Sequence, residues 1–278
     1  MSVHRSFQLP GTKLHLRQWG DGPVACVLIH GFGDGGYVWE DFCVSLPTGY
    51  RALAVDLCGH GFSQWSTDGR YETARHITDV IHVLDSLGLD RLVLVGHSLG
   101  AEISARVASA CPTRVAGLVL VDFGPDRNPA GMALVRSRLE ESLRVYQSTG
   151  DYLQWLIATR PLASLQLLQQ WVTSSLEGTR EGGFRLRIDP TMVELRSETE
   201  GEDAALWAML RCIEAPTLIV RGAGSAVLPR SVAEKMTLEM PNAILETIDE
   251  AGHAVMLDNP GAFRRVMGSF LSEIRQHV

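Results

Sequence analysis

Two residues of this chain have the type and the setting for nucleophilic chemistry, namely Ser98 and His253. Ser98 stands at the centre of Gly96-His97-Ser98-Leu99-Gly100, and His253 follows a glycine near the end of the chain. A serine hydroxyl attacks a carbonyl carbon efficiently when a histidine accepts its proton and a carboxylate orients that histidine. The order of serine, then an acid, then histidine occurs in known hydrolytic enzymes. The pair therefore predicts acyl transfer through a covalent serine intermediate.

The residues around Ser98 predict a strand, a sharp turn and a helix. Leu92 to Val95 is an apolar run too short for a helix, which is typical of a strand buried on both faces of a parallel sheet. The two glycines that flank Ser98 allow a tight reversal, so its hydroxyl is expected at the apex of a strained turn. A helical pattern follows and ends at Pro112. Its N-terminus favours negative charge beside Ser98.

Three more motifs follow predicted strands. Val24 to Ile29 leads into the glycine-rich segment His30 to Gly36, and Arg51 to Val55 leads into Asp56-Leu57-Cys58-Gly59-His60-Gly61-Phe62-Ser63. The last predicted strand, Ile244 to Ile248, precedes the His253 loop. Together with the serine pentapeptide, these motifs resemble the α/β-hydrolase superfamily in order and spacing. The resemblance covers essentially the whole chain, and it is specific for the fold but not for a substrate.

The resemblance implies an α/β fold with a mostly parallel eight-stranded sheet, helices on both faces and an inserted helical cap. The hydrolase core is expected over residues 1–125 and 210–278. The cap is expected over 126–209, where the alternation of strands and helices stops and helical patterns dominate. The resemblance also implies an oxyanion hole made by the backbone N–H groups of Phe32 and Leu99.

The acid of the expected triad is the one departure from the family pattern. The acid usually follows the strand that corresponds here to Thr217–Gly222, and alignment of the next turn places it at Ser225 or Ala226. Neither residue has a carboxylate. Asp122 ends the strand Val115–Val121, after which some members of the superfamily place their acid, so Asp122 is our candidate. Three alternatives remain open: an acid lost or replaced at Ala226, or a carboxylate of Glu102 or Glu250.

The cap is expected to cover an apolar chamber for the substrate. It carries several aromatic residues, which could line a pocket or could simply pack the cap helices onto the core. The candidate substrate contacts are Phe32, His97, Trp155, Trp171 and Met209.

Composition restricts the classes of partner. A formal net charge of -7 argues against nucleic acid and against an anionic membrane surface as partners. No apolar run approaches the roughly 18 residues of a membrane span, and the first residues do not resemble a signal peptide. The cysteines are scattered, odd in number and not spaced for a metal, which predicts reduced thiols in a cytoplasmic protein. They are Cys26, Cys43, Cys58, Cys111 and Cys212.

The sequence thus predicts a serine hydrolase that cleaves a carboxylic ester of a largely apolar small molecule through an acyl-enzyme on Ser98. Neither a metal nor an organic cofactor is implied, and the oligomeric state is left open. Two alternatives remain. One is a lactonase, thioesterase, lyase or cyclase of a biosynthetic pathway that uses the same triad. The other is a non-catalytic ligand-binding relative, which the missing acid after Thr217–Gly222 suggests.

Overall fold

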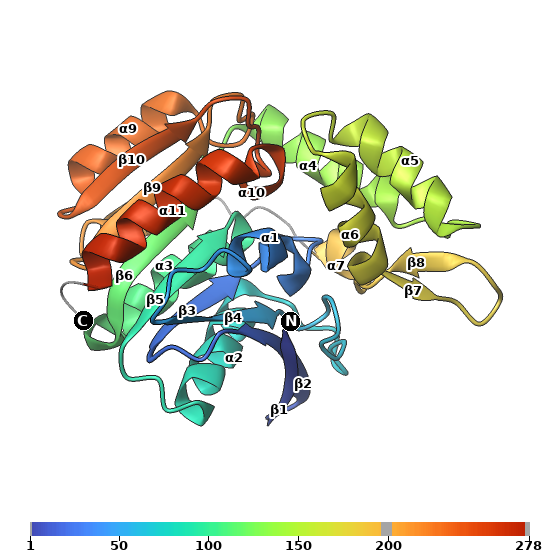
Figure 1. The fold of residues 1–278 in the computed structure, drawn as a ribbon, viewed down its shortest axis with the longest axis horizontal. Helices are drawn as coiled ribbons and strands as arrows, with labels where there is room; N and C mark the ends of the chain where they lie inside the picture. The colour runs from blue at the N-terminus through green and yellow to red at the C-terminus, as the bar shows by residue number, and fades with distance from the viewer. Residues whose placement is uncertain (1, 196–201, 276–278) are drawn as a thin grey trace.

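Eight strands form the central sheet of the computed structural model, which describes residues 2–195 and 202–275 (Figure 1). Their order across the sheet is β1-β2-β4-β3-β5-β6-β9-β10. The β1–β2 and β2–β4 pairs are antiparallel, and the remaining pairs are parallel. The expected mostly parallel eight-stranded sheet is therefore confirmed. The strands are β1 (Val3–Leu9), β2 (Thr12–Trp19), β3 (Val24–Ile29), β4 (Tyr50–Asp56), β5 (Leu92–His97), β6 (Val115–Val121), β9 (Thr217–Gly222) and β10 (Ala243–Ile248).

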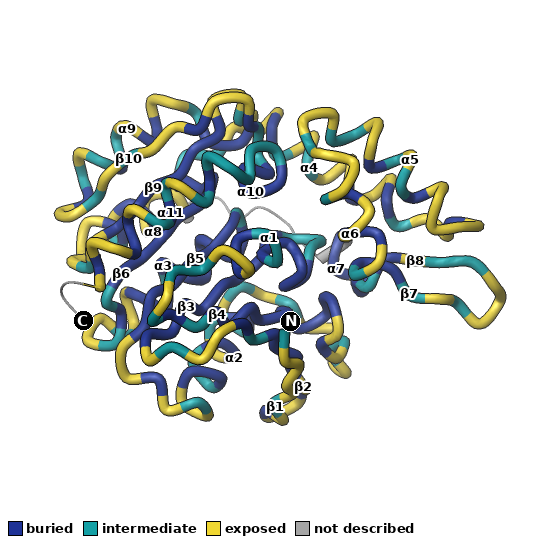
Figure 2. The backbone as a smooth tube through the Cα atoms, in the orientation of Figure 1, coloured by how far each residue is buried: buried dark blue, intermediate teal, exposed yellow. Residues whose placement is uncertain are grey.

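The central strands are apolar without interruption because both of their faces are covered. Every residue of β3 and of β5 is buried. Successive side chains of a strand point to opposite faces, so Cys26 and Leu28 enter one core while Val27 and Ile29 enter the other. Figure 2 shows these strands as the buried centre of the molecule.

Helices cover both faces of the sheet, as expected. One face packs against residues of α2 (Thr73–Ser86), α3 (Leu99–Ala110), α8 (Glu202–Leu210) and α9 (Arg230–Glu239). The other face packs against η1 (Gly36–Trp39), α1 (Glu40–Cys43), α10 (Val255–Asp258) and α11 (Pro260–Arg275). A short 3-10 helix, η2 (Pro112–Arg114), joins α3 to β6.

The described part of the segment between β6 and α8, residues 122–195, lies to one side of the sheet (Figure 1). Its ordered elements are α4 (Pro129–Ser142), α5 (Thr149–Thr159), α6 (Leu165–Ser175), β7 (Leu176–Gly178), β8 (Phe184–Leu186) and α7 (Met192–Leu195). Side-chain caps begin several of these helices: Asn128 accepts N–H bonds at the start of α4, and Ser148 forms a capping box with Asp151 at the start of α5. The division of the chain into core and cap stays a prediction.

Two details differ from the sequence expectation. Within the cap range, where helical patterns dominate the sequence, Leu176–Gly178 and Phe184–Leu186 pair as the antiparallel hairpin β7–β8. Helix α8 begins within the expected cap range 126–209 and ends at Leu210, and its Leu206 and Leu210 join the core cluster that contains Ile103 of α3. The boundary at 209 therefore falls inside a helix of the core, and residues 196–201 of the expected cap lie outside the described part of the chain.

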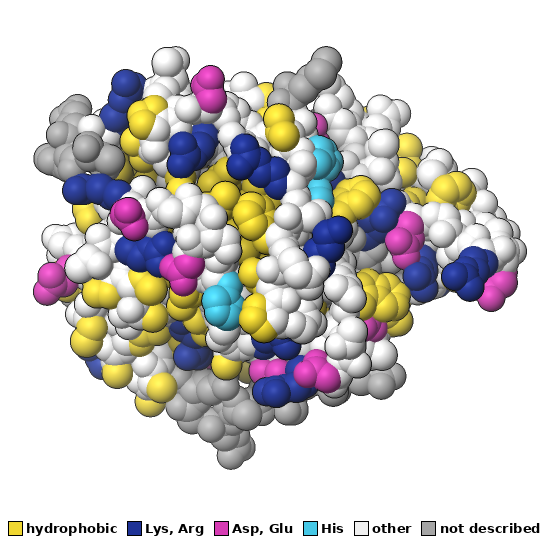
Figure 3. Space-filling model, turned by 90° about the horizontal axis from the view of Figure 1, so that it is seen from below, with side chains coloured by type: hydrophobic (Ala, Val, Ile, Leu, Met, Phe, Trp, Pro, Cys, Tyr) yellow, Lys and Arg dark blue, Asp and Glu magenta, His cyan; other side chains and the backbone are white. Residues whose placement is uncertain are grey.

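The surface carries charges of both signs. On the face drawn in Figure 3, Lys and Arg side chains and Asp and Glu side chains are both present. Within the described ranges, no helix has the length and apolar character needed to cross a membrane. The cellular location stays a prediction.

Candidate active site

Ser98 occupies a strained turn between β5 and α3. Its φ is 53°, a left-handed value that a residue with a side chain rarely adopts. The flanking glycines do not have positive φ values; they serve close packing instead. A Cβ on Gly96 would lie 2.2 Å from the carbonyl oxygen of Gly100, and a Cβ on Gly100 would lie 2.2 Å from that of Ile29. The turn therefore needs glycine on both sides because backbone approaches backbone.

Asp122 and His253, which are 131 residues apart, form a hydrogen-bonded pair. The imidazole Nδ1 lies 2.7 Å from Asp122 Oδ2, and because a carboxylate only accepts, Nδ1–H is the donor. The Asp122 side chain is completely buried. It also accepts the Gly222 N–H at 3.2 Å and the Ser225 hydroxyl at 2.5 Å. Asp122 is thus held by β9 and by the turn that follows it.

Ser225 stands where the family pattern suggests an acid, and its hydroxyl contacts the acid that the chain does have. The Oγ atom accepts N–H bonds from Val227 at 3.1 Å and Leu228 at 3.0 Å. With its lone pairs engaged by those donors, its hydrogen points to Asp122.

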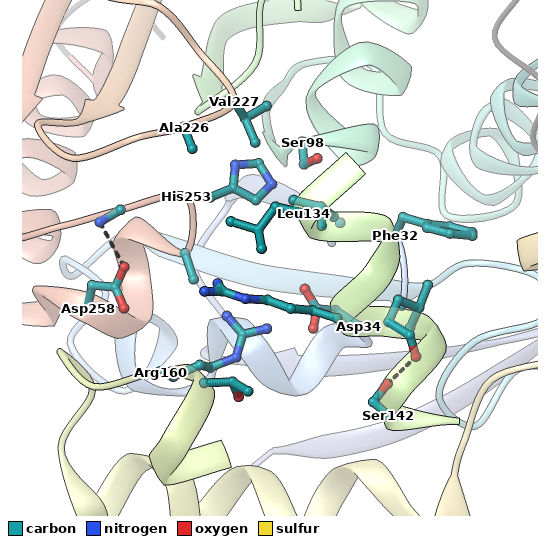
Figure 4. Close-up of a pocket in the computed structure, with 18 of the residues that line it drawn as sticks. Phe32, Asp34, Ser98, Leu134, Ser142, Arg160, Ala226, Val227, His253 and Asp258 are labelled. Atoms are coloured by element: carbon teal, nitrogen blue, oxygen red, sulfur yellow. Dashed lines mark hydrogen bonds between the residues drawn. The ribbon is translucent and has the colours of Figure 1, made fainter. Parts of the chain in front are cut away.

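The hydrogen-bond partner of His253 is Asp122, and the other candidate positions for the acid have different surroundings. Glu102 is paired with Arg106 at 3.1 Å and with Arg127 at 2.7 Å. Glu250 is exposed and has a φ of 53°. Ala226 lines the same cavity as His253 (Figure 4), but its methyl group has no proton-accepting atom.

His97 supports the backbone of His253. Its Nε2 lies 2.9 Å from the carbonyl oxygen of His253, which fixes Nε2–H as the donor. Burial lowers the pKa of His97 well below its usual value, with a smaller contribution from the neighbouring His253. His97 is therefore neutral, and although it lines the cavity, it is almost completely buried.

The glycine-rich loop after β3 is held by histidines from two sides. His30 accepts the Leu57 N–H at 3.0 Å, and His60 accepts the Gly33 N–H at 3.2 Å. Phe32 lies in this loop beside the cavity, and its ring packs edge-on against His60. Leu99 begins α3, and the N–H groups of a first helical turn have no acceptor within their own helix.

A cavity of about 280 Å³ brings most of the predicted residues together (Figure 4). Ser98 and His253 line it, and so do Phe32, Trp155 and Trp171. Apolar side chains such as Leu134 and Val227 complete much of the wall. Met209, a predicted substrate contact, does not line this cavity. It lies on α8 and packs against the core on the α3 side of the sheet, so this prediction is corrected.

The cavity also has charged groups that the sequence interpretation missed. Arg160 and Arg138 line it together with Asp34 and Asp258. Burial raises the pKa of Asp34, which the positive charge of Arg160 partly offsets. Burial likewise raises the pKa of Asp258, although its carboxylate accepts the Gly252 N–H at 2.9 Å. An arginine within an otherwise helical cap pattern gave no local signal that it faces a cavity.

Known proteins resemble this chain over most of its length. An esterase of Mycobacterium tuberculosis is 29% identical over 260 residues, which cover 91% of this chain and 85% of the esterase. The 2-hydroxymuconate semialdehyde hydrolase of Pseudomonas putida is 25% identical over 277 residues, or 98% of this chain and 95% of that enzyme. The crystal structure of E-2-(acetamidomethylene)succinate hydrolase is similar with a TM-score of 0.88, covering 98% of this chain and 100% of the other; at 23% identity, this likeness concerns the fold.

A family model supports the same relationship. The model of the alpha/beta hydrolase fold matches residues 25–260. The match includes the Ser98 turn, Asp122 and His253. With the eight-stranded sheet and the geometry described above, it shows that this chain belongs to the alpha/beta hydrolase fold family.

Proposed function

We propose that the protein is a serine hydrolase that cleaves carboxylic esters, with Ser98 as nucleophile, His253 as base and Asp122 as the orienting acid. The observation that carries the proposal is the 2.7 Å hydrogen bond between His253 Nδ1 and the buried Asp122 carboxylate. That bond leaves Nε2 of the imidazole as the proton acceptor. It also supplies the acid whose absence after β9 suggested a non-catalytic relative.

The proposed reaction has two acyl-transfer steps. Ser98 Oγ attacks the ester carbonyl while His253 Nε2 takes its proton, and the backbone N–H groups of Phe32 and Leu99 donate to the developing oxyanion. The imidazolium then protonates the departing alcohol. Water, activated by the same histidine, attacks the acyl-enzyme and frees the carboxylic acid and Ser98. Asp122 stays ionised and stabilises the imidazolium in both steps.

The cap is proposed to cover the cavity during these steps. Trp155 and Trp171 line the cavity from α5 and α6, and apolar side chains support a largely apolar substrate body. We place the end of the cap before α8, because that helix packs against α3. An ester is favoured over a lactone or thioester by the similarity to the mycobacterial esterase.

A hydrolysis screen of the wild type and Ser98→Ala tests the proposal. The panel contains short-chain aryl esters, alkyl esters, lactones and thioesters. We expect ester turnover by the wild type and a fall in kcat of about 10⁴-fold or more in Ser98→Ala, because the nucleophile and base act as a unit. A Ser98→Ala protein that keeps the wild-type rate would contradict the assignment. Preferential cleavage of lactones or thioesters would move the enzyme to one of the alternative substrate classes.

A further inference from the structure

Arg160 holds an unusual position for a charged side chain in this cavity. It is the C-cap residue directly after α5, and both its backbone N–H and its backbone carbonyl form hydrogen bonds. Its N–H donates to Leu156 at 2.8 Å, and its carbonyl accepts from Ala163 at 3.1 Å. The side chain extends into the cavity that also contains Ser98 and His253 (Figure 4). The guanidinium is therefore presented from an ordered helix end.

The guanidinium of Arg160 lies beside an aromatic ring of the cap. Arg160 Cζ lies 5.0 Å from the centroid of the Trp171 ring, and Trp171 in turn packs edge-on against Tyr37. A cation at this distance from an aromatic ring is attracted to it without using a carboxylate partner. Within the ranges 2–195 and 202–275, no carboxylate forms an ion pair with Arg160. Its N–H donors can thus meet a group from outside the protein.

Two acids line the cavity with Arg160, but neither forms an ion pair with its guanidinium. Asp34 and Asp258 line the same cavity, and burial raises the pKa of each. Arg138, on α4, adds a second cation to the cavity wall. Other arginines of the protein, in contrast, do have a carboxylate partner. Arg106 and Arg127, for example, both form ion pairs with Glu102.

We propose that Arg160 binds a carboxylate carried by the substrate, so that the ester that is cleaved belongs to a small molecule with one anionic end and an otherwise apolar body. A guanidinium presents two parallel N–H donors that match the two oxygens of a carboxylate. The proposal rests on the proposed ester hydrolysis for its reaction, but not for the binding of the anion. A cavity of about 280 Å³ requires the anion to lie close to the scissile ester.

Two matched pairs of probes test this specificity. On the acyl side, 4-nitrophenyl hydrogen adipate is compared with 4-nitrophenyl hexanoate; on the alcohol side, 3-acetoxybenzoate is compared with 3-acetoxybenzamide. In Arg160→Gln we expect kcat/KM for the anionic member of at least one pair to fall about 10- to 100-fold, mainly through KM. The neutral member should change by no more than about twofold, because it forms no charged contact. Arg160→Lys should keep part of the preference, and Arg230→Gln, on the exposed side of α9, is the matched control.

Calorimetric binding of the same probes to Ser98→Ala separates this inference from the proposed function. Binding to Ser98→Ala can be measured without turnover. If this protein prefers the anionic probe and the preference disappears in Ser98→Ala/Arg160→Gln, the carboxylate site is supported even if the wild type hydrolyses no ester. Equal binding of anionic and neutral probes in both pairs, or an equal loss for both members in Arg160→Gln, would overturn it. In that case Arg160 serves only to balance the charges of Asp34 and Asp258 in the cavity wall.

Discussion

At the residue scale, backbone strain marks the ends of three strands. Among the described residues, Ser98, Asp122 and Glu250 are the non-glycine residues with positive φ, at 53°, 50° and 53°. Ser98 follows β5, Asp122 follows β6, and Glu250 lies between β10 and His253. Such conformations cost of order 1–3 kcal/mol each and persist where the surroundings enforce them. The strained residues thus lie at the carboxyl ends of the strands, where the proposed nucleophile, acid and base come together.

Ser225 is expected to act through Asp122 as a positioning residue. In Ser225→Ala the carboxylate loses a hydroxyl donor, and the N–H groups of Val227 and Leu228 lose their acceptor. We expect kcat to fall about tenfold with little change in KM, which corresponds to one lost hydrogen bond to a charged group. Steady-state kinetics on one ester measures the split.

Ser225→Thr is the matched variant, because it keeps the hydroxyl. It should restore most of the wild-type kcat. If Ser225→Ala leaves kcat unchanged, or if Thr fails to rescue while the melting temperature falls equally in both variants, Ser225 contributes only to the shape of its turn.

At the element scale, the contact between α3 and the end of β3 depends on Gly100. A Cβ there would lie 2.2 Å from the carbonyl oxygen of Ile29 and 2.6 Å from that of His30. Gly100→Ala should therefore lower the melting temperature and slow the labelling of Ser98 by a fluorophosphonate, since α3 must move away from the strand. Thermal denaturation and labelling rates are the measurements.

Gly268→Ala is a control in which the change from glycine to alanine should raise the stability of the protein instead of lowering it. Gly268 lies in α11 with nothing within 4 Å of an added Cβ. Alanine there should stabilise the protein by about 0.5–1 kcal/mol, because glycine loses more conformational freedom in a helix. A Gly100→Ala protein as stable as the wild type would show that the helix can shift without cost.

Local patterns explain why the sheet elements could be predicted and the hairpin β7–β8 could not. The buried strands around Ser98 are continuous apolar runs, and this pattern suffices to identify them. The hairpin strands have three residues each, and only Leu176 and Leu186 are buried. Such short strands carry too little periodicity to stand out from a polar loop.

At the scale of the whole molecule, the site joins residues that no local pattern connects. The serine turn and the histidine loop have recognisable motifs, so both could be found in the sequence. The contact of Ser225 with Asp122 spans 103 residues, and the choice of Asp122 as partner of His253 depends on the order of β6, β9 and β10 in the sheet. Arg160 reaches the cavity only through the fold of the cap, and Met209 was misplaced because α8 returns to the core.

The value of kcat in Asp122→Asn, compared with that of Ala226→Asp, tests the central claim most directly. Asparagine keeps the size of the side chain but removes the charge that stabilises the imidazolium. We predict a fall in kcat of about 10³- to 10⁴-fold at nearly constant stability, as when this role is lost in serine proteases. Ala226→Asp should gain little, because His253 Nδ1 already has its acceptor. A nearly silent Asp122→Asn together with an Ala226→Asp variant that is orders of magnitude more active would contradict the account.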